Sequence, residues 1–402
     1  MTAAAHGLVA ANVRVASGRW RPLRRWLPVL AGLVLALYVG SSWLSLAIPE
    51  PSGPHAVGRQ RFVWVDESRP ESHTLDPDDA RSVPIQVWYP ARPGSGSPAD
   101  YVDGLEQIEA GLLASGELGR LEVLGLGLVR DPALDGADVA SDRSPFPLLL
   151  LSPGNATNVA FYASLAEDLA SKGYVVIGVD HPFQVSAVQV PGGEVAVYDR
   201  SVESSLQSVG PEIEERVADI GFVLDMVQAK SSDLDFLLPS LDLDKVGILG
   251  HSNGGIAAVE TCRHDARLAA CLNIDGQAGG GPFGYDLTST VPEQPFMFLT
   301  KEAALHEELH RRFEEAGEGT VRVVIPEADH GDFTDGALFE PSPNPFGGSA
   351  RSVAVTTRSA VSAFFDHWLR GTAGDSFRDL DAPSNLYVNV YPLGDRPPIP
   401  GS

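Results

Sequence analysis

Cysteine is scarce in this chain of 402 residues, which contains only two. Two cysteines are too few for a disulfide-built scaffold or for a zinc site made of thiolates. Basic residues are also outnumbered, with 29 lysines and arginines against 53 acidic residues and a formal charge of −24. Such a charge would repel a phosphate backbone, so we expect no nucleic-acid partner. Internal repeats are absent as well.

The two cysteines, Cys262 and Cys271, are close in the sequence, at the end of one expected helix and inside the next expected strand. A disulfide between them is one interpretation, because an extracytoplasmic protein meets oxidising conditions. Two buried thiols are the alternative, since free cysteine packs as a small apolar side chain. The sequence leaves both interpretations open.

Only one long hydrophobic stretch without charge occurs, from Leu27 to Ile48, and residues 1–26 before it are basic and contain no acidic residue. The stretch is long enough to provide the ~20 residues that cross a bilayer. The arginines before it predict that everything after it is exported. Its length favours a transmembrane signal anchor, whereas Ser45 and Ala47 fit the small residues of a cleaved signal peptide. We therefore expect either a single-pass protein of the cell membrane with an extracytoplasmic domain or a secreted protein.

The rest of the chain is divided by composition. Residues 49–60, rich in proline, glycine and serine, are typical of a linker. Residues 61–402 are expected to form one domain, and the hydrophobic content of 44% is enough for a sizeable core. Within it, residues 101–131 carry many leucines among scattered glycines, which indicates helices. These helices form either a lid over an apolar pocket or a layer packed on the core.

From Pro147 onward, short apolar strands alternate with longer amphipathic helices. The expected strands are 61–66, 83–89, 148–152, 175–180, 246–249, 268–274, 294–299 and 321–325, and the expected helices are 162–172, 211–229, 302–316 and 352–369. Such alternation predicts an α/β fold with a mostly parallel central sheet and helices on both faces.

The stretch Gly250-His251-Ser252-Asn253-Gly254 matches G-x-S-x-G and stands between an expected strand and an expected helix. A nucleophile elbow needs this context, because the serine must lie on a sharp turn between the two. The glycines remove side chains where the strand and helix backbones pass closest. A glycine-rich turn with an incidental serine would explain the pentapeptide but not its flanks. We therefore predict that Ser252 is a nucleophile.

A serine hydroxyl needs a base that takes its proton and an acidic group that orients the base. After an elbow of this kind, the acid and then the base follow in the sequence. Asp275 ends the strand that follows Ser252, and His330 lies in a loop just beyond the expected strand 321–325. That loop lies at the carboxyl edge of the sheet, where functional groups gather. Ser252, Asp275 and His330 are the predicted catalytic triad.

The anion formed in such a reaction needs two backbone N–H groups as donors. Asn253, directly after the serine, supplies one of them. The other is expected from the turn that follows the strand 148–152, where Pro153 has no N–H. Asn155, or alternatively Gly154, is therefore the second oxyanion donor.

A second motif, His306-Glu307-Glu308-Leu309-His310, matches the H-E-x-x-H of zinc peptidases. The apolar stripe of its expected helix is Leu305, Leu309 and Phe313, which leaves both histidines on the polar flank. A catalytic zinc site lies in a cleft and has a third protein ligand. We interpret the motif as a solvated helix face and predict no metal.

Together these residues resemble the α/β-hydrolases related to platelet-activating factor acetylhydrolase, the lipoprotein-associated phospholipase A2 type. The resemblance covers residues 60 to 370 and rests on Gly250–Gly255, Asp275, His330-Gly331-Asp332-Phe333, Val87-Trp88-Tyr89-Pro90 and the stretch from Phe161 to Val176. It implies the α/β-hydrolase fold, with Ser252 as nucleophile, His330 as general base and acid, and Asp275 as orienting carboxylate.

The resemblance also implies hydrolysis of short or oxidised acyl groups from phospholipids, or of other small esters, without a cofactor, metal or calcium. Pro153-Gly154 stands where members often have His-Gly, and Asn253 stands where many have an aromatic residue. Both departures touch the acyl site. A general esterase or polyester hydrolase, or a non-catalytic exported binding protein of the same fold, is therefore the alternative. The expected partners are a small ester or phospholipid substrate and the membrane, through residues 27–48. The sequence does not define the oligomeric state.

Overall fold

The computed structural model describes residues 26, 28–30, 32, 47–141, 145–200, 210–276, 292–301, 320–339, 349–372 and 387–391. The chain divides into a unit of residues 1–45 and a compact unit of residues 46–402, and the elements named below belong to the second. In the described ranges, no helix is both long and apolar enough to cross a membrane. The expected segment Leu27–Ile48 lies mostly outside these ranges, so the anchor and the signal peptide stay predictions.

In the described part of the chain, the fold is built on an eleven-stranded sheet with the order β13-β12-β11-β10-β9-β5-β6-β2-β1-β4-β3. The strands are β1 (Ala56–Pro70), β2 (Ala80–Ala91), β3 (Ser97–Asp100), β4 (Arg130–Asp135), β5 (Phe146–Ser152), β6 (Val175–Val179), β9 (Leu241–His251), β10 (Leu268–Ile274), β11 (Phe296–Thr300), β12 (Thr320–Val324) and β13 (Tyr387–Tyr391). All neighbours from β6 to β12 are parallel. The antiparallel strands β2 and β13 flank this block. The prediction of a mostly parallel α/β sheet is confirmed.

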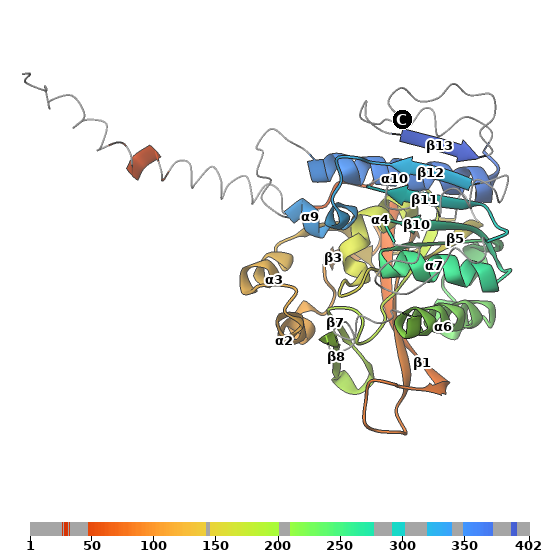
Figure 1. Ribbon diagram of the computed structural model, residues 1–402, viewed down its shortest axis with the longest axis horizontal. Coiled ribbons are helices and arrows are strands. Elements are labelled where there is room, and N and C mark those ends of the chain that lie inside the picture. Colours follow the sequence, from red (N-terminus) through yellow and green to blue (C-terminus); the bar gives the residue numbers. More distant parts are fainter. Residues whose placement is uncertain are drawn as a thin grey trace, which may run out of the picture. The chain divides into compact units, whose positions relative to one another are not determined.

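Helices cover both faces of the sheet (Figure 1). The helices α4 (Ala163–Ser171) and α10 (Ser349–Arg370) pack on one face, and α6 (Gly210–Gln228) and α7 (Asn253–His264) pack on the other. Successive side chains of a strand point to opposite faces. In β5, Leu149 and Leu151 accordingly join the first core, while Leu148 and Leu150 join the second. A continuous apolar run is therefore what a strand buried on both faces requires.

The backbone before β1 packs on the domain, although the composition of residues 49–60 is typical of a linker. The buried guanidinium of Arg358, in α10, donates to the carbonyl oxygens of Pro49 at 2.7 Å and Glu50 at 3.1 Å. Strand β1 then begins at Ala56, inside the expected linker. The composition of the segment cannot predict these contacts, because Arg358 is distant from it in the sequence.

Residues 101–131 contain two helices, as expected, α2 (Leu105–Ser115) and α3 (Arg120–Leu126). Helix α2 lies against the small hairpin of β7 (Ala187–Gln189) and β8 (Val195–Val197). The inward side chains of the two helices join the core: Ile108, Leu112, Val123 and Leu126. The segment therefore includes packed helices, and whether it also acts as a lid stays a prediction.

Cys262, near the end of α7, and Cys271, in β10, form a disulfide with a Cα–Cα distance of 6.4 Å. Of the two interpretations left open by the sequence, the structure contains the disulfide. The expected helix 302–316 lies outside the described residues, and so do His306 and His310 of the H-E-x-x-H motif.

Candidate active site

Ser252 occupies the turn between β9 and α7, with φ of 54° and ψ of −125°. A non-glycine residue at positive φ is strained, and the surrounding backbone must hold it there. A Cβ on Gly250 would lie 2.1 Å from the carbonyl oxygen of Gly254, so the strand and the helix touch at this point. A Cβ on Gly254 would lie 2.2 Å from the carbonyl oxygen of Ser152, in β5. Gly254 is therefore needed for the close approach of β5, not of β9.

The structure brings together the three side chains predicted as a triad. Asp275 follows β10 directly, and His330 begins a short 3₁₀ helix, His330–Phe333, beyond β12. The Nε2 atom of His330 lies 3.0 Å from the Oγ atom of Ser252. Its Nδ1 atom lies 2.6 Å from the Oδ2 atom of Asp275. The three parallel strands β9, β10 and β12 therefore deliver these residues to one edge of the sheet.

The surroundings of Asp275 favour its ionised form. Burial raises the pKa of its carboxyl group, but the hydrogen bonds from His330, from the N–H of Lys301 and from the hydroxyl of Thr300 outweigh burial and leave the pKa below its usual value. An ionised carboxylate only accepts, so the Nδ1 atom of His330 carries the proton. The Nε2 atom is then free to accept a proton from Ser252. This is the tautomer that a general base requires.

The two predicted oxyanion donors belong to the start of α7 and to the turn that follows β5. Asn253 is the first residue of α7, where a backbone N–H has no carbonyl group one turn earlier to bind. The N–H of Gly154 donates to the hydroxyl of Tyr162 at 2.9 Å. In the described part of the chain, the N–H of Asn155 forms no hydrogen bond. Of the two alternatives in this turn, Asn155 therefore offers the available donor.

His251, which precedes the serine, is buried and connects two other residues of the site. Its Nε2 atom lies 3.1 Å from the carbonyl oxygen of His330, and its Nδ1 atom lies 2.8 Å from the hydroxyl of Tyr162. The carbonyl only accepts, so Nε2 carries the proton and Tyr162 donates to Nδ1. Burial, and then the nearby charge of His330, lower the pKa of His251 to about 3. The ring is neutral at physiological pH. Sequence reasoning missed this role, for which the motif position was the only signal.

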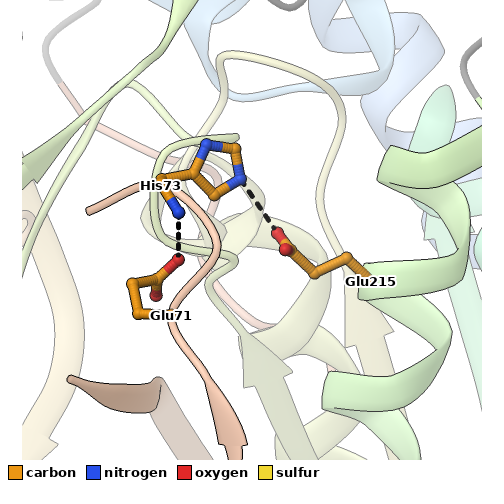
Figure 2. A group of neighbouring side chains, drawn as sticks. All are labelled: Glu71, His73 and Glu215. Carbon is orange, nitrogen blue, oxygen red and sulfur yellow. Dashed lines mark hydrogen bonds and ion pairs between the residues drawn. The ribbon is translucent and has the colours of Figure 1, made fainter. Parts of the chain in front are cut away.

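A different group of side chains lies between the β1–β2 hairpin and α6. Glu71, His73 and Glu215 could each offer one ligand atom to a cation, within 4.8 Å of one another. Figure 2 shows the ring of His73 directed at Glu215 and its backbone N–H at Glu71. The guanidinium of Arg81 lies 3.0 Å from Glu71 and 3.1 Å from Glu215. A metal ion would have to displace this cation, so we interpret the group as an ion-pair network.

Comparison with known protein families gives one match to this chain. The model of the family described as platelet-activating factor acetylhydrolase, isoform II, matches residues 41–190. The matched part includes β5 and the turn that contains Asn155, and it ends before Ser252.

Individual relatives extend the match. A protein named probable 1-alkyl-2-acetylglycerophosphocholine esterase, from Arthroderma benhamiae, is 28% identical over 294 residues, which are 67% of this chain and 69% of that protein. The platelet-activating factor acetylhydrolase of Cavia porcellus is 27% identical over 277 residues, which are 63% of this chain and 60% of the relative. The chain therefore spans about two thirds of the length of these relatives.

Among solved structures, a ferulic acid esterase from Streptomyces cinnamoneus has a TM-score of 0.68 and 28% sequence identity. The match covers 85% of this chain and 98% of that one. These comparisons confirm the resemblance predicted from the sequence: the chain is similar to the platelet-activating factor acetylhydrolases and to an esterase of known structure.

Proposed function

We propose that the protein is a serine carboxylic ester hydrolase that works through an acyl-enzyme on Ser252. The observation that carries the proposal is the chain of two short contacts, 3.0 Å from Ser252 to His330 and 2.6 Å from His330 to Asp275. The parallel strand order and the elbow between β9 and α7 support an α/β-hydrolase fold.

In the first half of the reaction, His330 takes the hydroxyl proton of Ser252 at Nε2 while Oγ attacks the ester carbonyl carbon. The oxyanion accepts hydrogen bonds from the N–H groups of Asn253 and Asn155. His330 then returns the proton to the alkoxide that leaves, and Ser252 keeps the acyl group. In the second half, His330 deprotonates water, which attacks the acyl carbon, and the acid is released as Ser252 regains its proton. Asp275 stays ionised and holds the tautomer of His330 throughout.

The proposed substrates are phospholipids with a short or oxidised acyl chain, in the manner of platelet-activating factor acetylhydrolase, because the relatives carry that name. The structural neighbour favours a second candidate, a general esterase that acts on soluble or polymeric esters. Hydrolysis of a phospholipid series with increasing acyl length, beside p-nitrophenyl and feruloyl esters, separates the two. Activity that falls with acyl length and exceeds that on feruloyl esters supports the first candidate.

We further propose that the domain is exported and either anchored to the cell membrane by residues 27–48 or released from it. The uncharged stretch after an arginine-rich segment supports export. Cell fractionation followed by mass measurement of the mature N-terminus tests this proposal. A full-length protein in the membrane fraction identifies the anchor, and a shortened protein in the medium identifies a cleaved signal peptide. Recovery from the cytoplasm would contradict both.

The catalytic proposal is tested with Ser252→Ala and p-nitrophenyl acetate or butyrate. Loss of the nucleophile should lower kcat by at least about a thousandfold, leaving the contribution of binding and the oxyanion donors. Ser359→Ala is the matched control, because Ser359 is half-buried on α10 and its hydroxyl donates to the carbonyl oxygen of Val355 in the same helix. Equal rates for Ser252→Ala and the wild type would overturn the proposal in favour of a non-catalytic binding protein.

A further inference from the structure

The turn that follows β5 is held at nearly every polar backbone group. The carbonyl oxygen of Pro153 accepts from Arg216 at 2.7 Å, and the N–H of Gly154 donates to Tyr162 at 2.9 Å. The N–H of Ala156 donates to the carbonyl oxygen of Gln184 at 2.8 Å. The hydroxyl of Ser186 donates to the carbonyl oxygen of the same alanine. Among these groups, the N–H of Asn155 is left without a partner in the described structure.

The backbone conformation of the turn needs such support. Ala156 has φ of 53°, a left-handed conformation that strains a non-glycine residue. A residue persists in that region only when the surrounding structure determines it. The direction of the neighbouring Asn155 N–H therefore depends on the surrounding groups that form hydrogen bonds with the turn.

The first set of these hydrogen bonds is a buried chain of three side chains, Ser152, His181 and Asp219. The Oγ atom of Ser152 lies 3.0 Å from Nε2 of His181, and Nδ1 of His181 lies 2.9 Å from Oδ2 of Asp219. These distances are similar to the 3.0 and 2.6 Å at Ser252, but the exposed fractions of the three residues are 1%, 0% and 0%. No ester can reach this serine. Since Asp219 also pairs with Arg81 at 2.8 Å, it is ionised and accepts the Nδ1 proton, so Ser152 donates to Nε2.

The second set of hydrogen bonds comes from α6, the helix that also carries Asp219. Arg216 lies one turn before Asp219 in α6, and it is fully buried. Its Nη1 atom binds the carbonyl oxygen of Pro153, while its Nε atom donates to Oε1 of Gln184 at 2.6 Å. Gln184 in turn accepts the N–H of Ala156 through its carbonyl oxygen. Through Arg216, one face of α6 thus holds the turn both before and after Asn155.

We propose that Arg216 and the buried Ser152–His181–Asp219 chain are positioning residues, which aim the N–H of Asn155 at the oxyanion of the tetrahedral intermediate. This inference rests on the proposed function. None of these residues touches the substrate, and each acts through the turn. Loss of either set of hydrogen bonds lets the turn relax and misplaces the N–H of Asn155, whose stabilisation of the oxyanion depends on geometry. The rate of acylation then falls while the binding of the ground-state ester is retained.

The test uses Ser152→Ala and Arg216→Lys, which are the smallest changes that weaken each set of hydrogen bonds. Reactive sites are counted first by titration with a fluorophosphonate, and the burst of p-nitrophenol then gives the acylation rate constant per reactive site. We expect a tenfold to hundredfold fall for Ser152→Ala with KM within about twofold, below the 10²–10³ of losing a whole donor. Arg216→Lys should retain part of the rate, because an ammonium group can still reach one carbonyl oxygen.

Two matched controls separate positioning from stability. Ser171→Ala removes a buried serine whose hydroxyl binds the carbonyl oxygen of Asp168, and Arg358→Lys changes a buried arginine that binds carbonyl oxygens near residue 50. Both should leave the rate per reactive site within about twofold of the wild type. If Ser152→Ala and Arg216→Lys lose only stability or reactive sites, with an unchanged rate per site, the positioning role is overturned. Ser252→Ala in the same assay decides the proposed function separately.

Discussion

The hydroxyl of Tyr162 joins two parts of the site, and Tyr162→Phe removes it without changing the volume of the ring. The hydroxyl accepts the N–H of Gly154 at 2.9 Å and donates to Nδ1 of His251 at 2.8 Å, all within the buried interior. A buried polar group left without a partner costs about 1–3 kcal/mol. Two such groups predict that the variant loses about 2–6 kcal/mol of unfolding free energy.

Urea unfolding followed by tryptophan fluorescence measures this loss by linear extrapolation. Tyr174→Phe is the matched control, since that hydroxyl makes one bond, to Asp366 at 2.7 Å. Asp366 retains Arg370 at 3.0 Å after the change, so the control should lose only about 1 kcal/mol. A loss for Tyr162→Phe no larger than that of the control would refute the reasoning that this hydroxyl bridges two buried groups.

Three further predictions concern the elbow and its neighbours. Gly254→Ala places a methyl carbon 2.2 Å from the carbonyl oxygen of Ser152, so the elbow must shift; esterase activity should fall at least about tenfold, and a wild-type rate would contradict the close approach. Asp275→Asn no longer selects the tautomer of His330, and kcat should fall about 10³- to 10⁴-fold; an unchanged kcat would exclude the orienting role. The unfolded chain protonates His251 near pH 6.5 while the folded chain does so only near pH 3, so stability is lost as the pH falls through this window. Between pH 6.5 and 5 this residue accounts for about 2 kcal/mol at about 1.4 kcal/mol per pH unit. His251→Gln should remove that slope in urea unfolding, and an identical pH dependence would contradict the neutral buried ring.

The sheet and the elbow could be predicted because their signals are local. Apolar runs such as Leu148–Leu151 indicate strands buried on both faces, and the elbow combines a motif with the strand and helix around it. The order of Asp275 and His330 after Ser252 follows from parallel strands that end at one edge. The structure brings these three side chains together, and their chemical roles stay predictions.

The supporting groups could not be predicted, because their partners are distant in sequence and carry no motif. Arg216 looks like one charged residue of an amphipathic helix, yet it is buried and binds Pro153, which precedes it by many residues. His181 and Asp219 form a second serine–histidine–aspartate chain with Ser152 that no spacing announces. Likewise, the segment before β1 has the composition of a linker, and only the fold reveals the arginine in α10 that holds it.

This second chain makes one measurement especially direct. The folded protein is treated with a fluorophosphonate, digested, and the modified serine is identified by mass spectrometry. We expect a single adduct on Ser252, whose hydroxyl faces His330 at the exposed edge of the sheet. We expect no adduct on Ser152, which has the same kinds of partners at similar distances but is 1% exposed. Labelling of Ser152, or no labelling of Ser252, would contradict the assignment of the nucleophile.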